Sequence, residues 1–213
     1  MKKLSLVFAF ILTFSSGMLD VYTYASRGEV FATMQTGNML KFAVAVFEDG
    51  RVLKFILPIL SFIVGIFVAR AFSLTENGRA YCLSVQAVLT ASVVFIPFSY
   101  EYNVFANCLL SIVGAMIFES FRVCCGTHYT ATMCTNDLRL FAEGFFDAIF
   151  KRSKKKTLFY LFIILCFTAG CVAGKALVDA IFNYTVLALA AFYVILFVIN
   201  IFIGKETCDI KQS

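Results

Sequence analysis

The sequence predicts an all-α membrane protein: a polytopic helix bundle of six spans plus two short re-entrant or interfacial helices, built as two inverted repeats. Composition is the first reason, because 61% of the 213 residues are hydrophobic, 15% are charged and mean hydropathy is +0.89. Soluble domains are about half apolar and a quarter charged. Recurring apolar windows and a duplicated polar segment are the other two reasons. Residues 1–213 are therefore interpreted as a single transmembrane domain.

Six windows near 20 residues are long enough to cross about 30 Å of hydrocarbon. They are Leu4–Tyr24, Leu53–Phe72, Ala80–Phe98, Val104–Phe121, Thr157–Val178 and Tyr184–Ile203. The first opens with MKKLSLVFAFILTFSS, which also has the basic start and apolar run of a signal peptide. Because the apolar pattern continues from Met18 to Ala25, we interpret this segment as an uncleaved first span.

Charge predicts the orientation. Five basic residues fall in the run Lys151 to Lys156, and a basic run beside apolar spans marks the cytoplasmic side. This basic loop (151–156) and both termini are expected in the cytoplasm, with the chain in the cell (inner) membrane. No long basic polar segment suits nucleic acid, so the expected partners are the lipid bilayer and a small-molecule solute, with a homo-oligomer left open.

An internal repeat begins in the stretch TMQTGNMLKFA at residue 33, which aligns with TMCTNDLRLFA at residue 132. At the same spacing Asp20 meets Glu119. Further on, FIVGIFVARA at residue 62 aligns with FTAGCVAGKA at residue 167, six residues out of the first register. The insertion KRSKKK has that length, so the sequence predicts a duplication, with repeat 1 at residues 4–98 and repeat 2 at residues 104–203.

The short segments decide how the repeats are oriented. Arg139, Glu143 and Asp147 recur every fourth residue and form a charged stripe on one helical face, which is costly against lipid. This segment is therefore expected at an interface or re-entering beside protein. Three spans in each half then invert the second half, as in many secondary transporters. If both short segments cross, the alternative is an eight-span bundle.

A short helix that starts within the polar cluster leaves backbone N–H groups free, which Thr or Asn side chains can cap and which can hold an anion or polar solute. Asp20 lies deep in the first span, where an ionisable group predicts a pathway residue. The candidate substrate-binding or pathway residues are Asp20, Thr33, Gln35, Thr36, Gly37, Asn38, Glu119, Thr132, Thr135, Asn136 and Asp137. A capped turn without ligand, and an ion pair of Glu119 with Arg122, are the structural alternatives.

Other chemistry has little support in the sequence. There is one histidine, no Gly-x-Ser-x-Gly motif and no phosphate-binding loop, so we expect no enzyme and no cofactor. Cys124, Cys125, His128 and Cys134 match no standard zinc spacing, so no metal site is assigned. The small-xxx-small pairs Gly170 with Gly174 and Gly65 with Ala69 favour close helix packing.

GMLDVYTYASRGEVFATMQTGNML and the later TATMCTNDLR resemble the YoaK family of multi-pass bacterial membrane proteins. The matching residues are Gly17, Asp20, Phe31, Thr36, Gly37 and Asn38. Where that family often has a Gln-Asn pair and a second Thr-Gly motif, this chain has Glu119, Ser120, Thr135, Asn136 and Asp137. The resemblance implies a polytopic inner-membrane protein and leaves the activity open.

The sequence therefore favours a permease or channel for a small polar or anionic solute. The alternative is a non-transporting membrane scaffold or a membrane-embedded enzyme. A water-lined cavity joining Asp20 to both polar segments would favour transport, whereas a dry interface would favour a scaffold.

Overall fold

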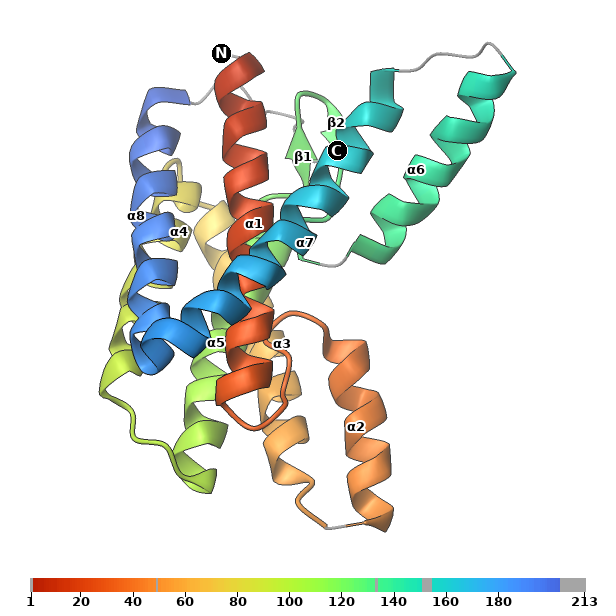
Figure 1. Ribbon diagram of the computed structural model, residues 1–213. Coiled ribbons are helices and arrows are strands. Elements are labelled where there is room, and N and C mark those ends of the chain that lie inside the picture. The colour runs from red at the N-terminus through yellow and green to blue at the C-terminus, as the bar shows by residue number, and fades with distance from the viewer. Residues whose placement is uncertain (1, 49, 133, 151–154, 204–213) are drawn as a thin grey trace.

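The computed structural model describes residues 2–48, 50–132, 134–150 and 155–203, and helices make up most of it (Figure 1). The helices in the first half are α1 (Lys2–Ser26), α2 (Gln35–Phe47), α3 (Leu53–Ser73), α4 (Gly78–Ser92) and the 3₁₀ turn η1 (Val93–Phe95). Those in the second half are α5 (Tyr100–Ser120), α6 (Cys134–Ile149), α7 (Lys155–Ile181), the 3₁₀ turn η2 (Phe182–Tyr184) and α8 (Thr185–Ile203).

The strands of the described chain form one small hairpin between α5 and α6. Strands β1 (Val123–Cys124) and β2 (Thr127–His128) pair antiparallel, with Val123 opposite His128. The turn residues Cys125 and Gly126 have φ of 51° and 76°, as a two-residue type I′ turn requires at both central positions. The hairpin returns the chain toward the start of α6.

The long helices have the length and apolar character of membrane spans. Five stretches qualify: Lys3–Ser26, Leu53–Ser73, Gly78–Phe95, Tyr100–Ser120 and the 46 residues of Thr157–Phe202. The last stretch contains both α7 and α8, so it covers the last two predicted windows. The prediction of an all-α, membrane-type bundle is confirmed, and a membrane or lipid environment follows from it.

Helix contacts define the interior of the bundle. Helix α1 packs along α7, and α5 packs along α3; α2 lies on α3 and α6 lies on α7. Helices α4 and α8 pack together, and they contact α5 and α1 respectively. The main apolar core includes Leu12, Leu19, Leu110, Val113 and Tyr193, from α1, α5 and α8. Helices α1 and α5 bury larger shares of their apolar windows than α3 and α4 do, so they are the inner helices.

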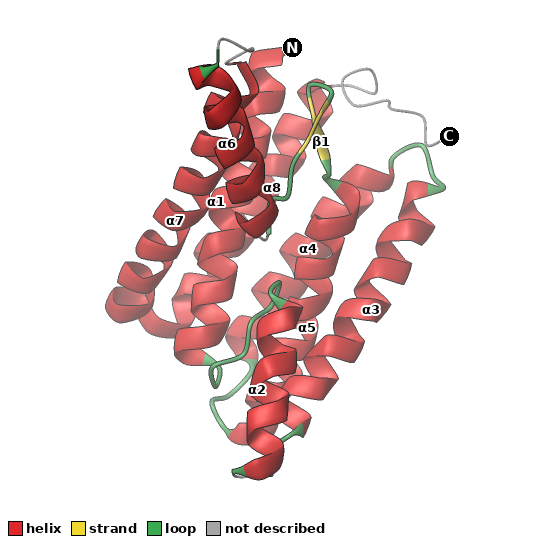
Figure 2. Cartoon of the chain, turned by 90° about the vertical axis from the view of Figure 1, so that its right-hand side faces the viewer, coloured by secondary structure: helices red, strands yellow, loops and turns green. Residues whose placement is uncertain are grey.

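The two short helices lie on the same face of the bundle, α2 near one end and α6 near the other (Figure 2). Their first turns point toward the middle of the molecule (Figure 2), and the loops that precede them meet there, because the Thr33 hydroxyl oxygen lies 3.0 Å from the carbonyl oxygen of Thr132. Both segments are helical, as predicted. The charged stripe on α6 is also present, since Arg139 pairs with Glu143 at 2.5 Å.

Glycines set the distance between the long helices. A Cβ atom added at Gly170 on α7 would lie 2.0 Å from the carbonyl oxygen of Phe14 on α1. One added at Gly17 on α1 would lie 2.2 Å from the carbonyl oxygen of Phe167. In the other pair, a Cβ at Gly65 on α3 would lie 2.8 Å from the carbonyl oxygen of Ile112 on α5. The backbones therefore touch where the small-residue motifs predict close packing.

We expect Gly170→Leu to separate α1 from α7 and to lower the thermal unfolding temperature of the detergent-solubilised protein. Overpacking at a well-packed site costs about 1–3 kcal/mol, and here the neighbouring group is backbone that cannot rotate away. The control is Val172→Leu on the same helix, because Val172 is 67% exposed and its replacement should change stability by less than about 0.5 kcal/mol. Equal stability of the two variants would contradict the contact.

Candidate functional site

Asp20 lies inside the bundle on α1, and its carboxylate binds the loop that precedes α2. The backbone N–H of Thr33 donates to Asp20 Oδ1 at 2.8 Å, and the hydroxyl of Thr33 donates to Asp20 Oδ2 at 2.5 Å. Both residues are buried. The carboxylate thus binds the residue just before the first turn of α2, and its donors are not the N–H groups of Thr36 to Asn38. Negative charge there is favourable, because helix starts carry partial positive charge.

The Thr33 hydroxyl connects the two halves of the chain. Its Oγ1 atom lies 3.0 Å from the carbonyl oxygen of Thr132, the residue that aligns with Thr33 in the repeat. A hydroxyl has one proton, so it donates either to Asp20 or to Thr132 at any moment. With Asp20 ionised, the carboxylate is the stronger acceptor. With Asp20 protonated, the carboxyl can donate to Oγ1, which leaves the Thr33 proton for Thr132.

Asn38 and Gln35 hold the same loop from the other side. The Asn38 amide accepts from Phe31 N at 2.9 Å and donates to Phe31 O at 2.7 Å, and Gln35 Nε2 donates to Ala32 O at 2.9 Å. The predicted side-chain cap is absent from α2: the N-cap position is Met34, which makes no capping bond. The polar side chains are used to fix the loop against Asp20, so that prediction was wrong in its detail.

The second half repeats this bracing in a weaker form. Asp137 aligns with Asn38, and its Oδ1 accepts a hydrogen bond of 3.4 Å from Thr130 N, the counterpart of Phe31 N. The atoms Thr132 Oγ1 and Asp137 Oδ2 are buried and make no hydrogen bond with any described residue. Burial raises the pKa of the Asp137 carboxyl to about 6, and the Thr130 N–H opposes that rise. A carboxylate equivalent to Asp20 does not reach Thr132.

The remaining polar residues of the two motifs lie outside this cluster. Thr36, Thr135 and Asn136 are exposed on the first turns of α2 and α6. Asn136 accepts from Arg139 at 3.2 Å. Gly37 packs on the ring of Phe31, where an added Cβ would lie 2.9 Å from Cδ2.

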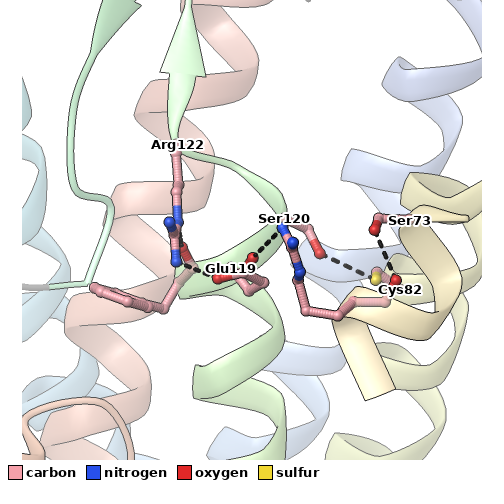
Figure 3. A network of polar contacts seen from close by, with 7 residues as sticks. Ser73, Cys82, Glu119, Ser120 and Arg122 are labelled. Carbon is pink, nitrogen blue, oxygen red and sulfur yellow. Dashed lines mark hydrogen bonds and ion pairs between the residues drawn. The ribbon is translucent and has the colours of Figure 1, made fainter. Parts of the chain in front are cut away.

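Glu119, the counterpart of Asp20, belongs to a separate network at the far end of α5 (Figure 3). Its carboxylate pairs with Arg122, three residues on, and with Arg70 from α3 at 3.3 Å. Next to it Ser120 contacts the Cys82 thiol at 3.2 Å. The ion-pair alternative therefore describes Glu119 in this structure, and the two cations keep it away from Thr132.

Arg27 is the polar residue that the sequence reading missed. It lies just past α1, is fully buried, and its guanidinium lies 3.7 Å from the ring centroid of Phe98. No carboxylate among the described residues forms an ion pair with it. Its acceptors are oxygen atoms of Tyr22, Val93, Ile96, Pro97, Asn103 and Asn183. Arg27 thus joins α1 to the α4–α5 and α7–α8 connections.

A surface pocket lies away from Asp20, near the start of α1 and the hairpin. Its lining includes Phe8, Arg79, Phe121, Tyr129 and Asn200. It shares no residue with the Asp20 cluster, so the two are separate features of the bundle.

A family model described as a protein of unknown function (DUF1275) matches residues 8–199. The chain belongs to that family. The match agrees with the resemblance to a multi-pass family of unknown function that the Asp20 and Thr36 to Asn38 motif indicated. No curated protein and no solved structure matches this DUF1275 chain.

Proposed function

We propose that this DUF1275 protein is a permease or channel for a small polar solute, with its pathway passing Asp20, Thr33 and Thr132. The observation that carries the proposal is the hydrogen bond between repeat-related residues, Thr33 to Thr132, beside a buried carboxylate. Ionisable groups buried within membrane spans are by default pathway or coupling residues. One histidine and no nucleophile motif lead us to propose transport rather than catalysis.

Two inverted three-span units are part of the proposal, and the helix contacts support them. The helix pairs are related by exchanging α1 with α5, α2 with α6, α3 with α7 and α4 with α8. Under this exchange the α1–α7 contact corresponds to the α5–α3 contact, and the α2–α3 contact corresponds to the α6–α7 contact. The α7–α8 stretch supplies two crossings, because η2 separates two helices, of which α7 packs along α1 and α8 packs mainly along α4. Helices α2 and α6 start near the middle of the bundle and run toward opposite ends, as re-entrant half-helices do (Figure 2).

Asp20 also narrows the solute class. An anionic solute would have to compete with the carboxylate that already occupies the start of α2. A neutral polar molecule or a proton meets no such competition. The Thr33 hydroxyl can then couple proton binding to a change in the loops. When Asp20 is protonated, the Thr33 hydroxyl is free to donate its proton to the carbonyl oxygen of Thr132. Cys171 on α7 and Tyr193 on α8 are titratable groups close enough for their charges to interact with that of Asp20.

The proposal is tested by reconstituting the protein in liposomes and screening uptake of small neutral, anionic and cationic solutes under a proton gradient. Uptake of a neutral polar solute above protein-free liposomes would support it. The non-transporting scaffold has one observation in its favour, since both oxygens of Asp20 already have donors from Thr33. Absence of uptake for every solute class, with correctly inserted protein, would favour that scaffold.

We further propose that the start of α1 and the α6–α7 connection face the cytoplasm in the inner membrane. The ends of α6 and α8 and the starts of α1 and α7 lie at the same end of the bundle (Figure 1). Of the basic loop, residues 151–154 lie outside the described residues, as does the predicted cytoplasmic C-terminus. The excess of basic residues around this end supports the orientation.

Cysteine labelling of intact cells tests the orientation. In a protein whose other cysteines are replaced, Cys125 in the hairpin turn should stay unmodified by an external, membrane-impermeant thiol reagent. A cysteine introduced as Glu48→Cys, exposed at the end of α2, should be modified. Permeabilised cells should give modification at both positions. The reverse pattern in intact cells would contradict the orientation.

A further inference from the structure

Helices α4 and α5 carry buried polar side-chain atoms that have no hydrogen-bond partner within the described chain. The buried atoms without a hydrogen-bond partner include both amide atoms of Gln86, the hydroxyls of Thr90 and Ser111, and the amide oxygen of Asn107. Each of these residues is at most 1% exposed. Gln86 and Thr90 are spaced by four along α4, as are Asn107 and Ser111 along α5, so each pair occupies one helical face.

Two contacts link α4 and α5 on either side of Gln86, Thr90 and Ser111. At one end, Cys82 on α4 contacts Ser120 on α5 at 3.2 Å. At the other end, Arg27 donates to Val93 O just after α4, and Arg27 O accepts from Asn107 Nδ2 at 2.7 Å. Helices α4 and α5 therefore run antiparallel, with Gln86, Thr90 and Ser111 between these two contacts and Asn107 at one of them.

The polar stretch also leads to the Asp20 site. Gly114 lies three residues beyond Ser111, and a Cβ added there would be 2.8 Å from Ala32 O and 2.9 Å from Thr33 Cγ2. The same side of α5 that carries Ser111 thus approaches the loop that Asp20 binds. Thr132 Oγ1, in the facing loop, is a further buried atom without a partner.

Buried amides and hydroxyls are costly unless something hydrogen-bonds to them, and ordered water or a bound molecule is the usual partner when protein is not. The set offers donors and acceptors but no ionisable group. A charged solute would lose its hydration here without gaining a counterion, whereas water or a small neutral molecule would satisfy the free atoms.

We propose that Gln86, Thr90, Asn107 and Ser111 form a hydrogen-bonding file between α4 and α5 that holds water and admits small uncharged polar solutes toward Thr33 and Asp20. The proposal rests on the proposed transport function and specifies the solute as uncharged. The file is a binding path for neutral hydrogen-bonding molecules, and Asp20 stands at its inner end.

Thiol accessibility in proteoliposomes tests the file without requiring transport. Thr90→Cys and Ser111→Cys are compared with Leu83→Cys and Leu110→Cys, matched controls on the same helices that are equally buried but apolar. The background protein has its native cysteines replaced. The probes are neutral methyl methanethiosulfonate and anionic sulfonatoethyl methanethiosulfonate, with rates normalised to those of a free thiol.

The neutral probe should modify the two file positions about tenfold faster or more than the leucine positions, because water reaches only the former. The anionic probe should react at neither. Equal rates at file and leucine positions would overturn the file, and rapid reaction with the anionic probe would overturn its restriction to uncharged molecules. If the neutral probe modifies the file positions but the protein takes up no solute, the proposed transport function is wrong and the hydrogen-bonding file is still supported.

If the cysteine variants fail to fold, a second measurement uses the natural protein. Hydroxyl radicals generated by radiolysis oxidise buried side chains that lie beside bound water. We expect oxidation of Met116, which is fully buried on α5 between Ser111 and Ser120, at a rate above that of fully buried Met18 on α1. Slower oxidation of Met116 than of Met18 would count against the file.

Discussion

Arg27→Leu is expected to prevent stable folding of the bundle. Leucine cannot donate hydrogen bonds, so the carbonyl oxygen of buried Val93 and those of Ile96 and Pro97 would lose a donor together. A buried acceptor left without a donor costs about 1–3 kcal/mol, and a hydrogen bond to a charged group is worth about 1.5–3 kcal/mol. Losing several of them together removes a large share of a protein's net stability. We expect little monodisperse protein after detergent extraction, and a lower unfolding temperature in what is recovered.

The matched control is Arg139→Leu. Arg139 has a side chain that is 61% exposed and a single exposed ion pair with Glu143, a contact worth about 0–1 kcal/mol. Arg27→Lys should fall between the two, since an ammonium keeps the charge but lacks the planar fork that reaches several oxygens. If Arg27→Leu and Arg139→Leu unfold at the same temperature, Arg27 does not hold the three connections together.

Asp20→Asn should leave the protein folded and lower uptake of the identified solute by about tenfold or more, as expected for a charged pathway residue. The variant can keep the local hydrogen bonds. Its amide oxygen accepts from Thr33 N, its amide nitrogen donates to Thr33 Oγ1, and the Thr33 hydroxyl then donates to Thr132. What is lost is the ability to take up and release a proton. The variant should therefore also lose any pH dependence of uptake that the natural protein has.

Two further substitutions separate charge from structure. Asp20→Leu leaves Thr33 N–H buried and unpaired, which should cost about 1–3 kcal/mol of stability in addition to activity. Asp179→Asn alters an exposed carboxylate paired with Lys175 and should leave uptake unchanged. Unchanged uptake by a folded Asp20→Asn protein would remove the carboxylate from transport and make it a structural clamp on the α2 loop.

The repeat predicted from the sequence identified the contact between Thr33 and Thr132, because an internal alignment pairs residues at equivalent positions in the two halves of the chain. Thr33 and Thr132 were paired by register alone, and they are in contact. The alignment could not predict which groups Glu119 contacts. Glu119 aligns with Asp20, but its carboxylate pairs with Arg70, which comes from another helix. An alignment shows which residues are equivalent in position, whereas the ion pairs of a side chain depend on the charged groups that pack around it.

The sequence did not predict the buried positions of Arg27 and Gln86, for a different reason. Arg27 comes just after an apolar span, where a cation ordinarily extends toward the membrane surface. Its burial depends on backbone carbonyls of two distant connections, which no local pattern reveals. Gln86 lies within a window that is apolar on average, so composition hides it. Both depend on how helices distant in sequence pack together.

The glycine contacts between α1 and α7, and between α3 and α5, imply which parts of the molecule can move. We expect helices whose backbones are in direct contact to move together, and each of these pairs combines a helix from the first half of the chain with a helix from the second half. A rocking motion would therefore carry α1, α6 and α7 against α2, α3 and α5. In the proposed transporter the moving units would each combine helices from both halves of the chain, and the loops that meet at Thr33 and Thr132 would lie between them.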